Sequence, residues 1–175
     1  LSRAEHLARI GELYARASEV AADNPFAWRR QRFTADELMT ATPENRMIGY
    51  PYTKLLNSND LTDQGAALIV CSVAKAEQLG IPRDRWVFVH AGTGTNDHWE
   101  LSVRDELYQS PAMRIAGRRV LELAGIGPDD VDHIDLYSCF PSAVQIATRE
   151  MGLGAGVGGD RPLTVTGGMS FAGGP

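Results

Sequence analysis

One cysteine lies where a thiol could become reactive. Cys139 stands between a predicted short strand and a predicted helix that opens at Pro141, in the stretch Tyr137-Ser138-Cys139-Phe140. The free N–H groups and the positive end of a helix favour the thiolate, which is the nucleophilic form of cysteine. An isolated cysteine is also often a small buried hydrophobic residue, so its position alone leaves both interpretations open.

A cluster of glycines ends the sequence. Residues 163–166 predict an apolar strand, and Gly167-Gly168, four further residues and Gly173-Gly174-Pro175 follow it. Glycines directly after a strand mark backbone that takes positive φ or approaches another group closely. We therefore expect Gly167, Gly168, Gly173 and Gly174 to form the wall of a site. Because the chain stops inside this cluster, with no closing helix or strand, we expect it to be a piece of a longer protein.

Two histidines flank a polar loop. His90 and His98 lie on either side of residues 92–97, which follow a predicted strand. Loops in this place of an open α/β sheet often present groups to a ligand. The spacing of the two histidines is not that of metal ligands, and no acidic or cysteine partner follows at such a spacing. We therefore predict no metal site.

A second glycine pattern resembles a nucleotide-binding motif. Residues 154–159 match G-x-G-x-x-G formally. They follow a predicted helix and lead into a strand, which is the reverse of the strand–turn–helix order that a dinucleotide site requires. We interpret them as a connection, not as a cofactor site.

The first 59 residues differ in character from the rest. A capping-box pattern at residues 2–5 and apolar residues at helical spacing up to Val20 predict a helix, which the Asn24-Pro25 step ends. A short second helix is predicted near residues 34–37. The remainder is rich in proline and polar residues, and predicts either an extended excursion draped over a neighbour or a mobile surface loop.

From residue 60 onward, predicted strands and helices alternate. A capping serine or a proline at the first helical position, and a glycine after the last, predict each helix. The alternation predicts an α/β layered fold. The first strand is apolar throughout, as in strands buried on both faces, which makes Cys71 a structural residue. The predicted strands are 65–71, 86–91, 133–136 and 163–166, and the predicted helices are 73–79, 111–124 and 141–151.

Composition narrows the class of protein. The chain has 175 residues, of which 43% are hydrophobic and 22% charged, as in one soluble globular domain. The net charge of −5 argues against nucleic acid or an anionic membrane as partner. No apolar run approaches the ~20 residues of a membrane-spanning helix. Two cysteines without paired spacing favour a reducing, cytoplasmic location.

Three blocks of sequence resemble one family when taken in order. Residues 63–67, Asp-Gln-Gly-Ala-Ala, resemble an Asp-Gly-Ala-Ala entry into a buried strand. Residues 137–140 fall where that family carries Asn-Glu-Ala-Phe or His-Asp-Cys-Phe, and residues 164–175 resemble Asn-x-x-Gly-Gly, four residues and Gly-His-Pro. From about Asn45 onward the chain thus resembles the C-terminal half of the thiolase superfamily, which includes acetyl-CoA acetyltransferases and a sterol-carrier-type branch.

The resemblance implies a fold and a division of the chain. It implies a thiolase-like α/β layered fold, a mixed sheet with helices on both faces. In this fold, residues 1–59 would form a loop and helical excursion over the acyl-CoA pocket. Residues 60–175 would then be the C-terminal α/β domain, incomplete at its C-terminus. A coenzyme A thioester is implied as the substrate, with no further cofactor.

The resemblance also implies a chemistry, acyl transfer in lipid metabolism. In the family, a cysteine of the N-terminal half takes the acyl group, the Gly-His-Pro histidine supports the thiolate and an oxyanion hole, and a second cysteine moves the α-proton. Cys139 stands in the register of that second cysteine in the sterol-carrier-type branch. The residues expected to contact substrate are Tyr137, Ser138, Phe140, Gly167, Gly168, Gly173 and Gly174.

The sequence departs from the family pattern at four positions. Gly174 replaces the histidine, Tyr137 stands at the Asn/His position, Ser138 at the acidic position and Thr164 at the asparagine. Loss of one oxyanion donor typically costs ~10²–10³ in rate. Two hypotheses follow: a slow or altered acyltransferase, or a non-catalytic acyl-CoA or lipid-binding protein or partner subunit. In neither do we expect this chain alone to turn over substrate.

A third hypothesis makes Cys139 the nucleophile of a small hydrolase, with His133 and Asp135 nearby in sequence. For partners, the resemblance implies acyl-CoA, a missing N-terminal half or companion subunit, and a homodimer or higher oligomer. Such pairing would cover apolar surface that a lone half leaves open.

Overall fold

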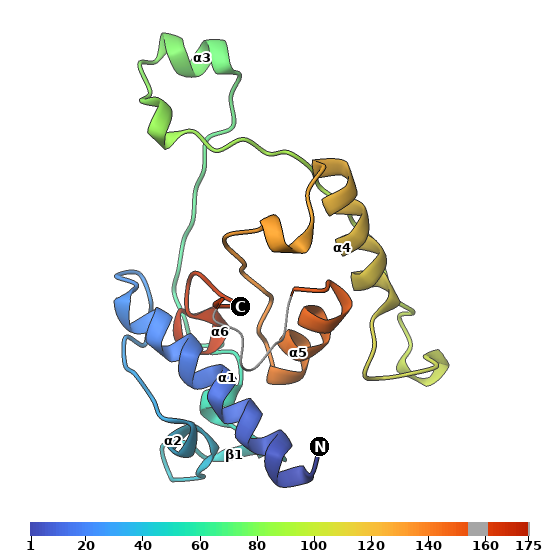
Figure 1. Ribbon diagram of the computed structural model, residues 1–175. Helices are drawn as coiled ribbons and strands as arrows, with labels where there is room; N and C mark the ends of the chain where they lie inside the picture. Colours follow the sequence, from blue (N-terminus) through green and yellow to red (C-terminus); the bar gives the residue numbers. More distant parts are fainter. Residues whose placement is uncertain (154–160, 175) are drawn as a thin grey trace.

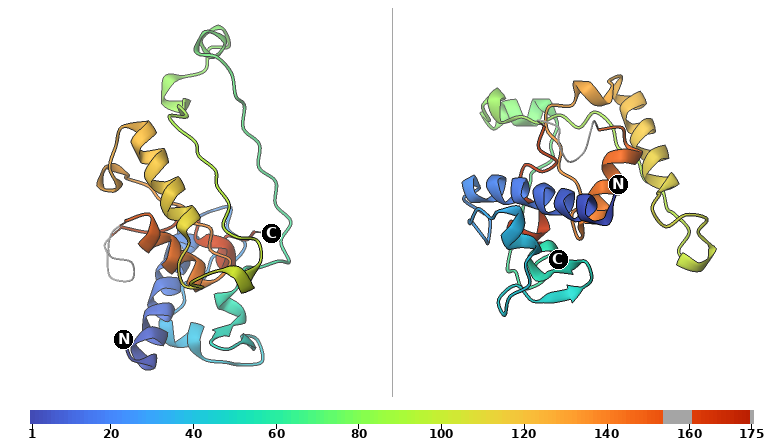
Figure 2. Two further views of the ribbon diagram at one scale, coloured as in Figure 1. Left: turned by 90° about the vertical axis from the view of Figure 1, so that its right-hand side faces the viewer. Right: turned by 60° about the horizontal axis from the view of Figure 1, so that its bottom comes forward.

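The computed structural model describes residues 1–153 and 161–174. The long helix α1 lies across a body formed with α2, α5 and α6, while α3 sits far from it at the end of an extended arm (Figures 1 and 2). The helices are α1 (Arg3–Asp23), α2 (Ala35–Met39), α3 (Val73–Gln78), α4 (Pro111–Ala124), α5 (Pro141–Glu150) and α6 (Gly168–Phe171), and the strands are β1 (Met47–Gly49) and β2 (Tyr52–Thr53). Short 3-10 turns cover Lys54–Leu56, Arg83–Arg85, Leu101–Val103 and Pro128–Asp130.

The predicted helices are confirmed, and so are the residues that bound them. The side chains of Ser2 and Glu5 form the predicted capping box of α1. Ser110 caps α4 by accepting a hydrogen bond from the Met113 N–H, and Gly125 ends that helix in the left-handed conformation. Each of these signals acts within one turn of helix, which explains why the sequence alone revealed them.

One hydrophobic core unites both ends of the chain. Phe171 of α6 is fully buried at its centre, stacked on Phe33 at 5.8 Å and edge-on to Tyr14 at 6.2 Å between ring centroids. The core thus joins α1 and α2 to α5 and α6 across the predicted boundary at residue 59. Its buried members are Ile10, Leu13, Tyr14, Ala21, Ala27, Leu38, Leu56, Val144, Phe171 and Ala172.

A buried amide fixes the segment between α2 and the small hairpin. Asn45 Nδ2 donates to the carbonyl oxygens of Glu37, Leu38 and Thr40, and Asn45 Oδ1 accepts from the Leu55 N–H. Around it, β1 and β2 pair antiparallel across a turn that contains a cis bond before Pro51. Since a buried amide is costly unless paired, these bonds hold the segment to α2.

The predicted strands are wrong for the part of the chain that the structure describes. None of the four forms a strand there, and the sheet it contains is the two-stranded β1–β2 hairpin. Between the predicted strands 133–136 and 163–166, a backbone hydrogen bond of 3.1 Å runs from the Leu136 N–H to the Leu163 carbonyl oxygen. The described residues thus form a helical body with one small hairpin, and the expected mixed sheet with helices on both faces is not seen among them.

The physical reason is most evident in the arm, which we define as residues 65–91. Its two extended stretches, predicted as strands 65–71 and 86–91, run beside solvent on the way to and from α3 (Figures 1 and 2). Leu68 is 83% exposed and Val87 92% exposed, and Cys71, predicted to be buried, is exposed as well. A strand needs a neighbour to receive its N–H and C=O groups, and the arm has none among the described residues.

Candidate functional site

Three segments meet at the corner that carries Cys139. The Met169 N–H donates to Ser138 Oγ at 2.9 Å, which ties the start of α6 to the corner before α5. The loop before the arm joins both: the Ser58 N–H donates to the Cys139 carbonyl oxygen, and the Asn59 N–H to the Met169 carbonyl oxygen. The structure therefore brings residues 137–140 and the glycine cluster together, although almost 30 residues separate them in sequence.

The glycines make this close approach possible. Gly168 has φ of 74°, and a Cβ there would lie 2.8 Å from Ser138 Oγ. Gly173 has φ of 103°, and a Cβ there would lie 2.8 Å from Thr62 Cγ2 and 3.0 Å from Trp28 Cδ1. Both the positive φ and the close backbone contact predicted from the sequence are confirmed at these positions.

Side chains below the glycine cluster hold its shape. Asp135 Oδ1 accepts hydrogen bonds from the Thr164 and Thr166 hydroxyls and from the Val165 N–H. The buried Thr164 Oγ1 in turn accepts from the Gly167 N–H at 3.0 Å. Asp135 is thus engaged with the turn. It offers Cys139 no visible assistance of the kind that the hydrolase hypothesis requires.

The segment after α1 closes the other side of the cluster. The Arg29 and Trp28 N–H groups donate to the carbonyl oxygens of Phe171 and Ala172, and Gln64 Nε2 donates to the Ala172 carbonyl oxygen at 2.6 Å. These bonds satisfy the carbonyl groups at the end of α6. They also bring the aromatic side chains of Phe26 and Trp28 to the glycine wall.

An open cavity of about 980 Å³ lies among these segments. Phe26, Trp28 and Tyr137 give it aromatic surface, and the backbone of the glycine cluster gives it a wall without side chains. Its size is at the upper end of the range for small-molecule sites, and apolar walls with a few polar groups are typical of them. Of the residues predicted for the site, it is lined by Tyr137, Ser138, Gly168, Gly173 and Gly174.

The other predicted site residues lie elsewhere. Cys139 is a half-buried free thiol that lines neither this cavity nor the second one described below, and Phe140 stacks on Tyr52 with 6.2 Å between ring centroids. Gly167 lines the second cavity. Burial, and after it the charge of Cys139, raise the pKa of Tyr14, whose hydroxyl donates to the Ser138 carbonyl oxygen. The thiol therefore lies within electrostatic reach of the buried phenol of α1.

Sequence reasoning missed the aromatic side of the cavity. Phe26 and Trp28 follow the Asn24-Pro25 step, which in the sequence indicates only the end of a helix. Exposed aromatic residues just after a helix were the available signal, but nothing local shows that this loop pairs with the end of α6. The 154–159 glycine pattern and Pro175 lie outside the described residues.

Within residues 1–153 and 161–174, no group of three or more His, Cys, Asp or Glu side chains could hold a metal ion. In the same residues, no helix has the length and apolarity needed to cross a membrane.

Comparisons with known proteins agree on one family. Residues 93–173 match the model of the thiolase C-terminal domain-like family. The chain is 27% identical over 134 residues to an acetyl-CoA acetyltransferase of Methanocaldococcus jannaschii, covering 77% of this chain and 33% of that protein. It is 26% identical to sterol carrier protein 2 of Rattus norvegicus, covering 87% of this chain and 27% of that protein. The chain thus spans about a third of the length of these relatives.

Solved structures extend the likeness to the whole fold. A monomeric SCP2-thiolase like protein type 1 from Mycobacterium smegmatis matches 99% of this chain at 40% identity and a TM-score of 0.88, with 38% of that protein covered. The Ltp2-ChsH2(DUF35) aldolase matches at 21% identity and a TM-score of 0.74, covering 95% of this chain and 46% of that one, and supports the fold alone. Residues 93–173 thus match the thiolase C-terminal domain-like family, and the chain has the fold of the matched part of an SCP2-thiolase like protein.

Proposed function

We propose that this chain contributes the C-terminal half of a thiolase-like acyltransferase that acts on acetyl-CoA or longer acyl-CoA thioesters in lipid metabolism. The observation that carries the proposal is the 980 Å³ cavity, because all three family-like blocks contribute to its wall: residues 63–66, Tyr137 and Ser138, and the glycine cluster. The names of the relatives, acetyl-CoA acetyltransferase and sterol carrier protein 2, support the same substrate class.

The cavity suits a thioester in its shape and its donors. The bare backbone at Gly168 and Gly173 lets a flat thioester group approach closely, and the Trp28 and Phe26 rings offer apolar surface to an acyl chain. Tyr137 is exposed in the cavity, and its hydroxyl is a hydrogen-bond donor for a thioester or enolate oxygen. Since Gly174 stands where the family carries histidine, Tyr137 would carry more of this stabilisation than its counterpart does.

The arm fits the proposal as a contact with the rest of such a protein. The Mycobacterium smegmatis structure matches nearly the whole chain, arm included, and more than half of that protein lies beyond the match. An apolar, extended and unpaired stretch needs strands beside it. We assign the arm to a missing N-terminal half or a companion subunit, and association into a homodimer or larger oligomer and a cytoplasmic location complete the proposal.

The test of catalysis uses the intact protein with acetyl-CoA. We expect an acyl-enzyme in intact-mass spectra and thiolysis of an acyl-CoA in a turnover assay. If Cys139 moves the α-proton, Cys139→Ala lowers turnover by ~10²–10⁴. Cys71→Ala is the matched control, since that thiol lies on the arm. An intact protein without acyl-enzyme and without turnover would overturn the acyltransferase proposal.

A second candidate function is a non-catalytic acyl-CoA or lipid-binding protein or partner subunit. It is favoured by two observations: Gly174 occupies the histidine position, and Cys139 does not line the cavity. Calorimetry should then detect acyl-CoA binding that Trp28→Ala weakens, with no thiolysis. Leu101→Ala, outside the cavity, should leave binding unchanged, and measurable turnover would exclude this candidate.

A further inference from the structure

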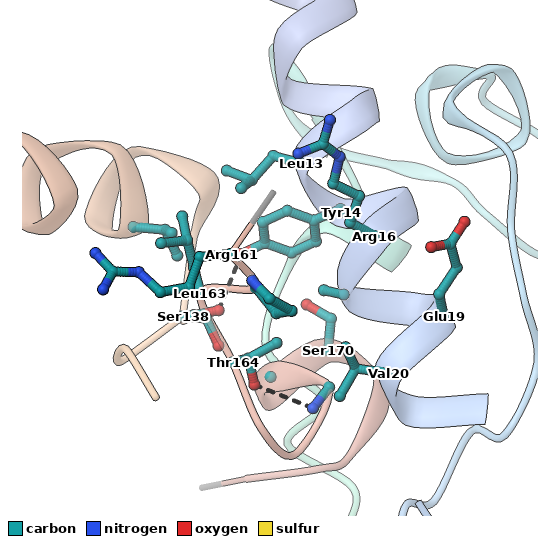
Figure 3. Close-up of a pocket in the computed structure, with 15 residues that line it drawn as sticks. Leu13, Tyr14, Arg16, Glu19, Val20, Ser138, Arg161, Leu163, Thr164 and Ser170 are labelled. Carbon is teal, nitrogen blue, oxygen red and sulfur yellow. Dashed lines mark hydrogen bonds between the residues drawn. The ribbon is translucent and has the colours of Figure 1, made fainter. Parts of the chain in front are cut away.

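A second cavity, of about 290 Å³, lies between α1 and the segment that leads into α6 (Figure 3). It shares Ser138 and Gly168 with the proposed thioester cavity, but most of its wall is different. One side is an apolar stripe of α1, and the other side is the stretch before the glycine cluster. The apolar residues around it are Leu13, Ala17, Val20, Val144, Pro162 and Leu163.

One buried hydroxyl in this cavity has no hydrogen-bond partner. Ser170 is 2% exposed, and no described residue forms a hydrogen bond with its Oγ. The hydroxyl lies close enough to the Tyr14 phenol to oppose part of the rise in the Tyr14 pKa, but the phenol donates to the Ser138 carbonyl oxygen instead. Figure 3 shows the Ser170 side chain directed into the space between α1 and residues 161–164.

The other polar groups of the wall are already used. Thr164 Oγ1 donates to Asp135 and accepts from the Gly167 N–H, and Ser138 Oγ accepts from the Met169 N–H. A buried polar group that lacks a partner costs free energy, and a ligand oxygen would remove that cost. Within the described lining, Ser170 is therefore the side chain that selects what the cavity holds.

The rim of the cavity is a fixed structure. The Arg161 guanidinium donates to the carbonyl oxygens of Pro128, Val131 and Leu153, so it is held in place by the turn at 128–131 and by the segment after α5. Arg16 and Glu19 of α1 complete the rim with opposite charges. A wall built this way keeps its shape without a ligand.

We infer that this cavity binds a neutral, elongated apolar molecule that carries one hydroxyl or carbonyl oxygen, with that oxygen on Ser170. A cavity of 150 Å³ lined by apolar side chains holds benzene, so 290 Å³ suits a molecule roughly twice that size, such as a medium-chain alcohol or ketone. The ligand proposed for this cavity differs from the thioester proposed for the larger cavity. It does not require the chain to act on acyl-CoA.

The test titrates 1-octanol into the intact protein labelled at its methyl groups. We expect saturable shifts of the Leu13, Val20, Val144 and Leu163 methyl signals. Ser170→Ala should weaken the affinity by roughly three- to tenfold through loss of one hydrogen bond. Ser102→Ala, an exposed serine on a distant turn, should leave it unchanged.

Two variants fill the cavity from α1. Ala17→Phe should abolish the octanol shifts, and Val20→Trp provides the same test if the first variant does not fold. Shifts that persist in a folded filled variant, or no saturable shifts in the wild type, would overturn the proposal. Octanoate binding more tightly than octanol would overturn the neutral ligand class. Each of these readouts is independent of acyl-CoA turnover.

Discussion

The body and the arm of this molecule contain the same kinds of apolar residue with opposite surroundings. In the body, Phe171 is fully buried among side chains from α1, α2 and α5. In the arm, a run as apolar as any in the chain is almost fully exposed, as at Leu68 and Val87. The contrast shows that apolar sequence is sufficient for burial only where a second element is present to cover it.

Helices and strands differ in this respect because their hydrogen bonds differ in range. A helix satisfies its backbone within four residues, so α1 and α4 form wherever their caps and periodicity lie. The N–H and C=O groups of a strand form their hydrogen bonds with a neighbouring strand from another part of the chain. The arm keeps an extended backbone, but no neighbouring strand pairs with it among the described residues. The apolar pattern that predicted a buried strand therefore indicates that the arm needs a second element to cover it.

The largest effect should come from the centre of the body. Phe171→Ala removes a fully buried ring that contacts Phe33 and Tyr14, and we expect a loss of about 3–5 kcal/mol in the free energy of unfolding. Phe88→Ala is the matched change in the arm, where the ring is 59% exposed and faces Trp86. Urea unfolding of both variants measures the two losses in the free energy of unfolding. Similar losses would mean that the arm is packed as tightly as the body.

A smaller loss is expected at the glycine cluster. Gly168→Ala must keep φ of 74° and place a Cβ 2.8 Å from Ser138 Oγ, so we expect destabilisation by about 2 kcal/mol. Acyl-CoA binding should weaken with it, because the wall of the larger cavity shifts. Gly92→Ala, with no atom within 4 Å of the added Cβ, is the control just beyond the arm. A stable Gly168→Ala protein with unchanged binding would contradict the close approach described above.

A pH-dependent effect is expected at the start of α4. Asp97 accepts the Ser110 hydroxyl and the Ala112 N–H, and mainly the bond from Ser110 holds the pKa of Asp97 below its ordinary value. A carboxylate with a depressed pKa stabilises the fold above its ordinary pKa, and the effect is lost as pH falls through the lower, folded-state value. Because Asp97 is only partly buried and solvent screens its charge, Asp97→Asn should cost no more than about 0.5–1 kcal/mol at pH 7.

Thermal unfolding at two pH values checks this prediction. The gap between wild type and Asp97→Asn should begin to narrow as the pH falls below about 4, the ordinary pKa of aspartate, and should narrow further as the pH approaches the lower, folded-state pKa of Asp97. Glu106→Gln, an exposed carboxylate nearby in sequence, serves as the control. A gap that is equal at pH 7 and pH 3 would show that the charge of Asp97 does not contribute.

The smallest effect is expected in the arm itself. Leu68→Ser should change the stability of the 175-residue chain by less than about 0.5 kcal/mol, since the side chain is 83% exposed. In an intact protein whose other half covers the arm, the same change should cost several times more. Equal, small effects in both would contradict the assignment of the arm to a contact with another half or subunit.

The candidate site was predictable in parts that follow from local chemistry. The glycine cluster predicted positive φ and close backbone contact. The residues before Pro141 predicted a polar turn at the start of a helix. The pairing of these segments through Ser138 and Met169 is a long-range contact, which no single stretch of sequence encodes. The loop that brings Trp28 to the cavity was missed for the same reason.

The sequence by itself determined the helices, their caps, the glycine geometry and the likeness to one family, because each depends on residues close together in the chain. Only the tertiary structure decided that the core crosses residue 59, that Tyr137 lines the larger cavity while Cys139 does not, and that Ser170 is left without a partner. These outcomes depend on which distant segments pack together. Packing is a property of the whole chain and of what covers its arm.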